Sequence, residues 1–254
     1  MADVLVKALN ALGYQPVFLP RTGIAPPELY TFVKPRLVRH GDLRLYLNNA
    51  PVPKPTCGKL ADIQTTQTSG KNFGAAADFL KSALTALGIT SIPKVDLSFA
   101  GTGAFVFSFS NLTYASVDPA VIEILLPNLK IPPAISDDVV TSGQLHIAYE
   151  YAYSDTLLMS RADGTTFAND ISGKVGDFIN VSTNTKVEVQ GNRVVSFVST
   201  TGEKAGFAYK AGRVRKEEDR WIFEPETVQR DESGESIAFV PAKGVVLRAE
   251  DSGT

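Results

Sequence analysis

The side chains that most often carry out catalysis are few in this sequence, and their spacing does not match a catalytic site. The two histidines, His40 and His146, have no serine or carboxylate at a spacing that marks a triad. We interpret His40 as a turn residue and His146 as a residue on the face of a strand. The one cysteine, Cys57, excludes an internal disulfide and a zinc cluster. These residues do not indicate an enzyme.

Two glycine-containing stretches and one acidic cluster also lack the spacing of ligand sites. Residues 101–103 (GTG) lack the third glycine of a dinucleotide-binding loop and lead into a strand. Residues 68–71 (TSGK) lack the spaced first glycine of a phosphate loop. Residues 217–219 (EED) have no metal-ligand spacing and are typical of a solvated turn. The sequence therefore predicts no catalytic residue, no cofactor and no metal site.

Length and composition limit the remaining classes of protein. With 254 residues, of which 44% are hydrophobic, the chain can bury one large core or two small ones. The net charge of −2 and the pI near 5.8 argue against a nucleic-acid partner, because no run of basic residues is present to neutralise phosphates. No stretch reaches the roughly 18 to 20 apolar residues of a transmembrane helix, and from the residues at the N-terminus we expect no secretory signal. We therefore expect a cytoplasmic protein.

The strongest pattern is the alternation of residues 144–153, which predicts a strand with two different faces. Ser154-Asp155 predicts a turn, and Thr156 to Arg161 a second strand that pairs with the first as a long antiparallel ribbon. Two interpretations remain open, a half-buried hairpin and a strand that can also cross a bilayer, since both require alternation. The large side chains expected on one face are Leu145, Ile147, Tyr149, Tyr151 and Tyr153.

Other stretches predict further strands and several short helices. Phe105, Phe107 and Phe109 alternate within 104–112 and are expected on one face of a strand. Residues 50–70, rich in Pro, Thr, Gln and Ser, are expected to form a loop or a weak edge strand. The other expected strands are 17–19, 29–33, 42–47, 95–99, 204–214, 220–223, 237–240 and 245–247, and the expected helices are 2–12, 72–87, 118–126 and 136–140.

Several segments in order along the chain resemble the bacterial gasdermins. The resemblance begins with the opening residues, and it implies an α+β fold with a twisted, mostly antiparallel central sheet and several short peripheral helices. It departs at the N-terminus, where family members carry a lipid-modified cysteine and this chain reads Met1-Ala2-Asp3. The matching segments are Gly13-Tyr14, Val17–Arg21, Ile24–Leu29, Val117–Pro119, Leu145–Ala162 and Gly206–Ala211.

The resemblance implies an autoinhibited pore-forming protein. Residues 1–229 would form the pore-forming domain, and residues 230–254 a short inhibitory peptide that an activating protease releases. The cut protein, a monomer in the cytoplasm until then, would bind membrane lipid and oligomerise into a β-barrel pore in the inner (plasma) membrane, killing the cell in antiphage defence. No nucleic acid is involved. A soluble β-rich binding module without membrane activity is the alternative, and an enzyme with a scattered site is a third.

Three sets of candidate residues follow from this interpretation. A polar loop separates the body of the chain from an apolar C-terminal segment, and such a loop is where proteases cut. The cleavage region is Arg230, Asp231, Glu232, Ser233 and Gly234. The expected contacts of the inhibitory peptide are Ile237, Phe239, Val245 and Leu247. The membrane-strand candidates are Phe105, Phe107, Phe109, Leu145, Ile147, Tyr149, Tyr151 and Tyr153.

Overall fold

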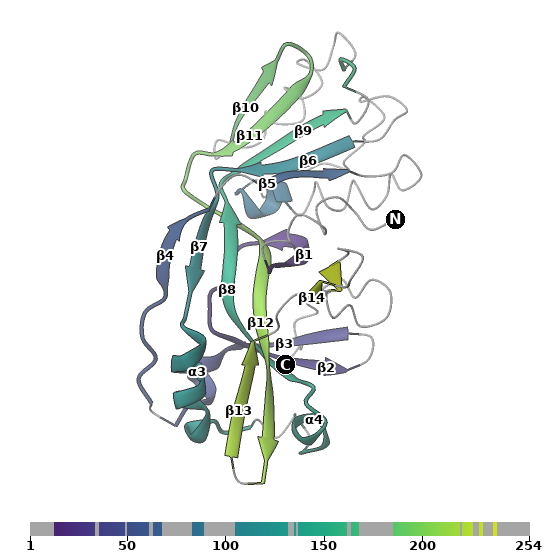
Figure 1. Cartoon of the computed structure of the whole chain (residues 1–254). Helices are drawn as coiled ribbons and strands as arrows, with labels where there is room; N and C mark the ends of the chain where they lie inside the picture. The colour runs from purple at the N-terminus through teal and green to yellow at the C-terminus, as the bar shows by residue number, and fades with distance from the viewer. Residues whose placement is uncertain are drawn as a thin grey trace.

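Two antiparallel β-sheets, joined by strands that run from one into the other, dominate the structure (Figure 1). The predicted fold class, α+β with a twisted, mostly antiparallel central sheet and short peripheral helices, is confirmed. The computed structural model describes residues 13–33, 36–48, 50–60, 63–67, 83–88, 105–131, 135, 137–161, 164–167, 185–218, 220–225, 229–230 and 236–237.

The larger sheet, called the eight-stranded sheet below, forms the base of the molecule. Its strands are β1 (Gln15–Arg21), β2 (Glu28–Val33), β3 (Arg36–Asp42), β4 (Thr56–Lys59), β7 (Thr113–Ser116), β8 (Leu145–Ser154), β12 (Ala205–Glu217) and β13 (Arg220–Pro225). The strand order is β1-β12-β8-β2-β3; β13 also pairs with β12, and β7 pairs with β8 and β4. β8 and β12 share the longest pairing and form the centre of this sheet.

The smaller sheet, called the five-stranded sheet, lies above the base in Figure 1. Its strands are β5 (Ile63–Gln67), β6 (Phe105–Ser110), β9 (Thr156–Arg161), β10 (Thr185–Gln190) and β11 (Val194–Ser199). The strand order is β10-β11-β9-β6-β5, and every neighbouring pair is antiparallel. β5 lies at an edge, as expected for a strand in the polar stretch 50–70.

Short helices flank the sheets. In α3 (Pro119–Leu125), the Asp118 carboxylate accepts a hydrogen bond from the Ala120 N–H at 2.8 Å, and Pro119 occupies the first turn, as the sequence predicts. The others are η1 (Leu43–Tyr46), η3 (Leu126–Asn128), α4 (Asp137–Thr141) and a helical segment at 83–86. No helix in these described parts of the chain is long and apolar enough to span a membrane.

The predicted ribbon of β8 with β9 is wrong, because the two strands do not pair with each other. β8 pairs with β12, β2 and β7 in the eight-stranded sheet, whereas β9 pairs with β11 and β6 in the five-stranded sheet. Asp155 is thus a corner between two sheets and not a hairpin turn. β6 continues into β7 and β11 into β12 at the same level, so three strands cross from one sheet to the other.

A second correction concerns the strand predicted at 42–47. The extended segment is β3, which ends at Asp42, and residues 43–46 form the 3-10 helix η1. The Asp42 carboxylate accepts a hydrogen bond from the Arg44 N–H at 2.9 Å, so Asp42 caps this turn. The predictions for helix 2–12, most of helix 72–87 and strands 95–99, 238–240 and 245–247 lie outside the described residues.

Three groups of buried apolar side chains hold the elements together. The upper core joins the five-stranded sheet to the segment 83–87 and to β12; the helix-side core joins the eight-stranded sheet to α3, η3, α4 and η1. The tyrosine cluster lies on the eight-stranded sheet and consists of Ile24, Tyr30, Ala148, Tyr151, Tyr209 and Ala211. These three groups decide which faces of the candidate strands are covered.

Candidate functional site: the five-stranded sheet and its polar corner

The residues with catalytic potential are separated in the fold. His40 Nε2 lies 2.9 Å from Thr31 Oγ1, and burial lowers the pKa of His40 because the imidazolium loses hydration. His146 Nδ1 lies 3.1 Å from the carbonyl oxygen of Gln144, two residues earlier in the same chain. Cys57 is exposed on β4. Among the described residues, no three His, Cys, Asp or Glu side chains are grouped so that they could hold a metal ion.

The acidic cluster lies at the turn between β12 and β13. Glu217 and Glu218 are exposed, and Glu218 has a φ of 54°. Arg215 Nη1 lies 3.3 Å from Glu217 Oε1, an exposed ion pair of the kind that contributes little to stability. The interpretation as a solvated turn is confirmed for Glu218, and Glu217 is the exposed last residue of β12.

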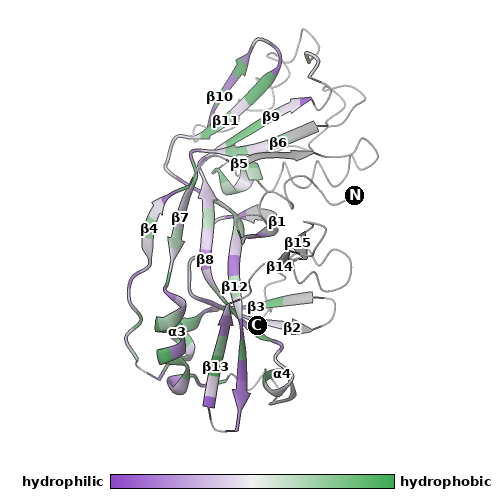
Figure 2. Cartoon of the chain, viewed as in Figure 1, coloured by the Kyte–Doolittle hydropathy of each residue, from purple (hydrophilic) through white to green (hydrophobic). Residues whose placement is uncertain are grey.

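The five-stranded sheet has one apolar and one more polar face, because side chains alternate along each strand. The apolar face lies in the upper core and includes Phe107, Phe109, Leu157, Met159, Val195 and Phe197. Hydrophobic and hydrophilic residues are interspersed along β10 and β11 (Figure 2). The opposite face carries Ser108, Leu158, Ser160, Lys186, Glu188 and Ser196. Phe107 and Phe109 thus share one face, as predicted, and the side chain of Phe105 lies outside the described set.

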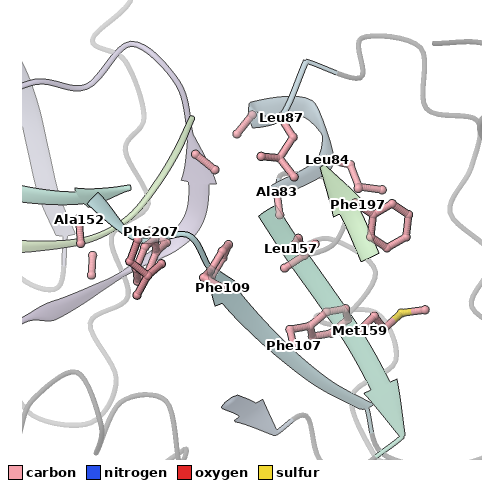
Figure 3. Packing of buried hydrophobic residues seen from close by; sticks show 14 of the residues in the cluster. Ala83, Leu84, Leu87, Phe107, Phe109, Ala152, Leu157, Met159, Phe197 and Phe207 are labelled. Atoms are coloured by element: carbon pink, nitrogen blue, oxygen red, sulfur yellow. The ribbon is translucent and has the colours of Figure 1, made fainter. Parts of the chain in front are cut away.

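The helical segment at 83–86 covers this apolar face (Figure 3). Ala83, Leu84 and Leu87 are fully buried in the upper core, together with strand side chains such as Leu157. Gly88, with a φ of 98°, ends the helix as predicted. This segment therefore supplies part of the cover that keeps the apolar face of the sheet from water.

β12 supplies a second part of the cover over the same face. The rings of Phe109 and Phe207 stack with centroids 4.4 Å apart, so the five-stranded sheet packs directly on the eight-stranded sheet here. Phe207 is 1% exposed.

A polar corner marks the level at which the three strands change sheets. Ser154, fully buried, lies with its hydroxyl 2.5 Å from the Ser110 carbonyl and accepts a hydrogen bond from the Thr156 N–H at 3.0 Å. Asn111 Nδ2 donates to the Asp155 carboxylate at 2.6 Å. These bonds satisfy polar groups that the interrupted ladders leave without partners.

The third crossing strand is tied to the same corner. The Ser199 N–H, at the end of β11, donates to the Asp155 carbonyl at 2.9 Å. Lys204 Nζ, at the start of β12, lies 3.2 Å from Thr113 Oγ1 on β7. The end of β11 is thus bonded to the β8–β9 crossing, and the residue before β12 is bonded to β7.

The structure divides the five large side chains of β8 between two groups, so the prediction that they share one face is wrong. Leu145, Ile147 and Tyr149 belong to the helix-side core. Tyr151 belongs to the tyrosine cluster, and Tyr153 packs against that cluster.

A β-bulge at Tyr149 causes this division. Glu150 pairs with Lys210 of β12, whereas Ala148 pairs with the very next residue of β12, Ala211, so that Tyr149 is an extra residue. The extra residue shifts the alternation by one, which turns the side chains beyond it to the other face. An unbroken alternation in the sequence therefore does not give one apolar face.

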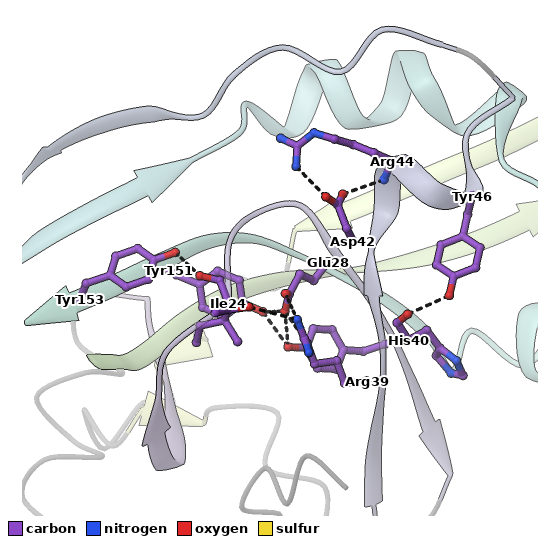
Figure 4. A network of polar contacts seen from close by, with 11 residues as sticks. Ile24, Glu28, Arg39, His40, Asp42, Arg44, Tyr46, Tyr151 and Tyr153 are labelled. Carbon is purple, nitrogen blue, oxygen red and sulfur yellow. Dashed lines mark hydrogen bonds and ion pairs between the residues drawn. The ribbon is translucent and has the colours of Figure 1, made fainter. Parts of the chain in front are cut away.

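A buried carboxylate organises the tyrosine cluster (Figure 4). Glu28, 2% exposed, accepts hydrogen bonds from the hydroxyls of Tyr30 and Tyr151 at 2.8 and 2.7 Å. Arg39 donates to both oxygens of the same carboxylate, through Nε at 3.1 Å and Nη2 at 2.5 Å. Burial, and then the charge of Glu28, raise the pKa of Tyr30, so its hydroxyl stays protonated and donates. The network ties β2, β3 and β8 together.

A second carboxylate, that of the partly buried Glu150, fixes the start of β1. Tyr14, 1% exposed, donates a short hydrogen bond to Glu150 Oε1. Lys210 Nζ lies 3.0 Å from the same oxygen and 4.4 Å from the centre of the Tyr14 ring. Burial and then the bond to Glu150 raise the pKa of Tyr14. This contact and the bond from Tyr209 to Gln15 at 2.7 Å hold β1 on the central strands.

The C-terminal candidates fall largely outside the described residues. β14 (Gln229–Arg230) and β15 (Ser236–Ile237) form a two-stranded ribbon in which Arg230 pairs with Ser236 and Gln229 with Ile237. The predicted cleavage loop therefore connects two paired segments. The candidates outside the description are Asp231, Glu232, Ser233, Gly234, Phe239, Val245 and Leu247.

Glu28, Arg39, Glu150 and Lys210 were missed by sequence reasoning. Each is a charged residue at an alternate position of a strand, where the usual expectation is a solvent-facing side chain. The tyrosines at 14, 30 and 151 are the available signal, because a buried tyrosine requires a hydrogen-bond partner for its hydroxyl.

Comparison with known proteins assigns the family. A profile of the Bacterial Gasdermin Family matches residues 17–234. A gasdermin of Piscinibacter sakaiensis is 36% identical over 255 residues, covering 98% of this chain and 96% of the relative. A gasdermin of Vitiosangium sp. (strain GDMCC 1.1324) is 23% identical over 211 residues, with 77% and 79% of the two chains covered.

A solved structure shows the same fold. A bacterial gasdermin from Bradyrhizobium tropiciagri matches with a TM-score of 0.59 at 15% sequence identity, over 88% of this chain and 91% of that chain. This fold defines the class of the protein: an α+β protein of two sheets, in which the smaller sheet has one covered apolar face and one more polar face. The chain belongs to the bacterial gasdermin family and is a gasdermin-type pore-forming protein.

Proposed function

We propose that this protein is an autoinhibited pore-forming protein that a protease activates by cutting near the C-terminus. The cut protein oligomerises into a β-barrel in the inner membrane and kills the cell, in defence against phage. The observation that carries this proposal is the two-faced five-stranded sheet, whose apolar side chains on β6, β9 and β11 are covered by the helical segment at 83–86 and by side chains such as Phe207 of β12. A membrane barrel needs the same alternation, with lipid on one side and water on the other.

The lipid-facing side chains come from the five-stranded sheet in this proposal. Phe105, Phe107 and Phe109 of β6 keep their role as membrane-strand candidates. The candidates of β8, Leu145 to Tyr153, lie in the eight-stranded sheet on two different faces, which suits a base that remains outside the bilayer. Exposure of the apolar face requires the segment 83–87 to leave it.

The inhibitory segment in this proposal is residues 230–254, and the body is residues 1–229. A cut within Arg230 to Gly234 leaves Ile237, Phe239, Val245 and Leu247 on a separate peptide. Each fully buried large side chain contributes about 1.5 to 3 kcal/mol, enough in combination to hold the peptide while it is attached. After the cut the peptide loses its high effective concentration and dissociates.

The proposed partners change on activation. The intact protein is a cytoplasmic monomer whose partner is the activating protease. The cut protein binds membrane lipid and further copies of itself at the inner (plasma) membrane. No catalytic group, cofactor or nucleic acid takes part.

The test replaces residues 231–235 with the recognition sequence of a specific protease. The cut protein is mixed with liposomes of bacterial lipid that contain a self-quenched dye, and induction of the protease is paired with a viability count in cells. We expect dye release and loss of viability after the cut, and neither when the same protease acts on a protein without the site.

Dissociation of the peptide is measured in parallel by mass spectrometry after size exclusion. If the peptide has left and the liposomes stay sealed, the pore-forming proposal is wrong for this chain, and the soluble β-rich binding module takes its place.

A further inference from the structure

We propose that β10 leaves the five-stranded sheet during pore formation and that its residues straighten into an extension of β11, opening the β10–β11 hairpin. The barrel unit of one copy would then be β11-β9-β6-β5. This inference rests on the proposed pore-forming function, and it states which strand pairing must break.

Strand length gives the first argument. A strand that crosses a bilayer needs about 9 to 11 residues, whereas β6, β9 and β11 have six each. β11 cannot grow at its C-terminal end, because Ser199 is bound to the Asp155 carbonyl at the polar corner. It can lengthen only at Val194, and the residues before Val194 are the hairpin turn and β10.

The hairpin turn consists of residues that can also adopt an extended conformation. Gly191 and Asn192 have φ values of 54° and 53° and belong to the three residues, 191–193, that connect the paired residues Gln190 and Val194. Glycine adopts positive-φ and extended conformations about equally readily, and asparagine is among the residues that adopt both of these conformations. Two backbone bonds hold the turn, one from the Arg193 N–H to the Gln190 carbonyl at 3.0 Å and one from the Phe167 N–H to the Asn192 carbonyl at 2.7 Å, and both must break when the hairpin opens.

The direction of the strands gives the second argument. All neighbours in the five-stranded sheet are antiparallel, so the first and fifth strands, β10 and β5, run in the same direction. In a ring of identical copies, β5 of one copy would meet β10 of the next in a parallel pair. Membrane barrels of this kind are antiparallel. Without β10 the unit has four strands, and β5 meets β11 of the next copy in antiparallel orientation.

The alternation of side chains gives the third argument. Val187 and Val189 of β10 pack against the same upper core as Val195 and Phe197 of β11. In a straightened strand these four odd-numbered residues again share one face, since the turn has not shifted the alternation. Arg193, the one charged odd-numbered residue between them, is the position on this face that contact with lipid disfavours. The even-numbered residues include Lys186, Glu188 and Gln190, which suit a water-facing surface.

Two disulfides that share one position test the inference. Glu188 of β10 and Leu158 of β9 are both paired with Ser196 of β11, on its two sides. Directly opposed residues of antiparallel strands have Cα atoms about 4.5 to 5.5 Å apart, which is within the range that a disulfide bridges. The pairs Glu188→Cys/Ser196→Cys and Leu158→Cys/Ser196→Cys are made in a Cys57→Ser background that carries the engineered protease site.

Each variant is cut and mixed with liposomes, with and without a reductant. We expect the β10–β11 disulfide to abolish dye release until the reductant is added. The β9–β11 disulfide should leave dye release at the level of its reduced form, because that pair persists in the barrel.

Two results would overturn the inference. If the oxidised β10–β11 variant releases as much dye as the same variant after reduction, the hairpin stays closed in the pore. Loss of dye release from the oxidised β9–β11 variant alone would show that β11, and not β10, leaves. If a reduced variant fails to fold, the pairs Lys186/Val198 and Thr156/Val198 replace it with the same logic. A cut Cys57→Ser parent that leaks nothing refutes the pore-forming function itself.

Discussion

Replacing Arg39 with methionine would remove the cation from the buried carboxylate of Glu28 while keeping most of the apolar volume of the side chain. The Glu28 side chain is 3% exposed and that of Arg39 is 18% exposed, so the pair is largely shielded from solvent. Breaking a buried ion pair by removing one partner costs about 3 to 5 kcal/mol, because the remaining charge is uncompensated.

The structure places the expected loss at the lower end of that range. Glu28 keeps hydrogen bonds from Tyr30 and Tyr151 after the substitution, and water can reach the site through the partly exposed position 39. We expect a loss of about 3 kcal/mol in the free energy of unfolding. Adding Glu28→Gln to Arg39→Met removes the charge, and the amide oxygen still accepts from a tyrosine, so the double variant should recover about 1 kcal/mol or more.

Urea denaturation followed by circular dichroism measures both values in the intact protein. The loss for Arg39→Met should change little between low and high salt, since a buried pair is weakly screened. The reasoning is refuted if Arg39→Met costs less than about 1 kcal/mol, the level of an exposed pair, or if the double variant is less stable than the single one.

Three further predictions concern other parts of the fold. Burial lowers the pKa of His40, so as the pH falls the imidazole of the unfolded chain is protonated before that of the folded protein. The folded protein therefore loses stability as the pH falls below about 6.5, the ordinary pKa of histidine. The melting temperature of His40→Gln should fall less between pH 8 and pH 5 than that of the parent. Leu84→Ala, at a fully buried position, should lower stability by about 2 to 5 kcal/mol and speed dye release after the cut, and unchanged urea curves would contradict this. A Cβ at Gly206 would lie 2.4 Å from Ile24 Cδ1, so Gly206→Ala should cost about 1 to 3 kcal/mol, and Ile24→Val, which lacks that atom, should restore part of the loss in a double-mutant cycle.

Local signals were sufficient for most of the described elements. The alternation at 144–153, the cap of Asp118 with Pro119 and the glycine stop at Gly88 each gave an element that the structure contains. Such signals depend on residues close in sequence, so they survive in any tertiary context that buries the expected face. The prediction of a strand at 42–47 was wrong because Asp42 caps the 3-10 helix at 43–46. No local pattern distinguishes an aspartate that caps a turn from one within a strand.

The pairing of strands was beyond the reach of local patterns. Ser154-Asp155 has the composition of a hairpin turn, yet the partners of β8 and β9 come from β12 and β11 more than thirty residues away. The bulge at Tyr149 is likewise set by the register of β12 and leaves no mark in the alternation of β8. The candidate site could not be predicted fully for the same two reasons, because strand pairing and the position of the bulge decide which face each of its side chains lies on. The two-faced character of β6, in contrast, followed from Phe107 and Phe109 alone.

The two sheets are held by different kinds of contact, and this difference favours a molecule with a fixed base and a convertible upper part. In the eight-stranded sheet, the buried carboxylate of Glu28 and the partly buried carboxylate of Glu150 bind side chains from β2, β3, β8 and β12 and from Tyr14, directly before β1. Separating those strands would leave a buried charge without partners, which is costly. The five-stranded sheet is held on its apolar face by side chains such as Leu84. At the polar corner it is held by hydrogen bonds in which at most one of the two partners is charged. Apolar contacts of this kind can be exchanged for lipid with little loss, because lipid tails are as apolar as the core they replace. The part of the fold that the proposed function requires to move is therefore the part whose contacts a membrane can substitute.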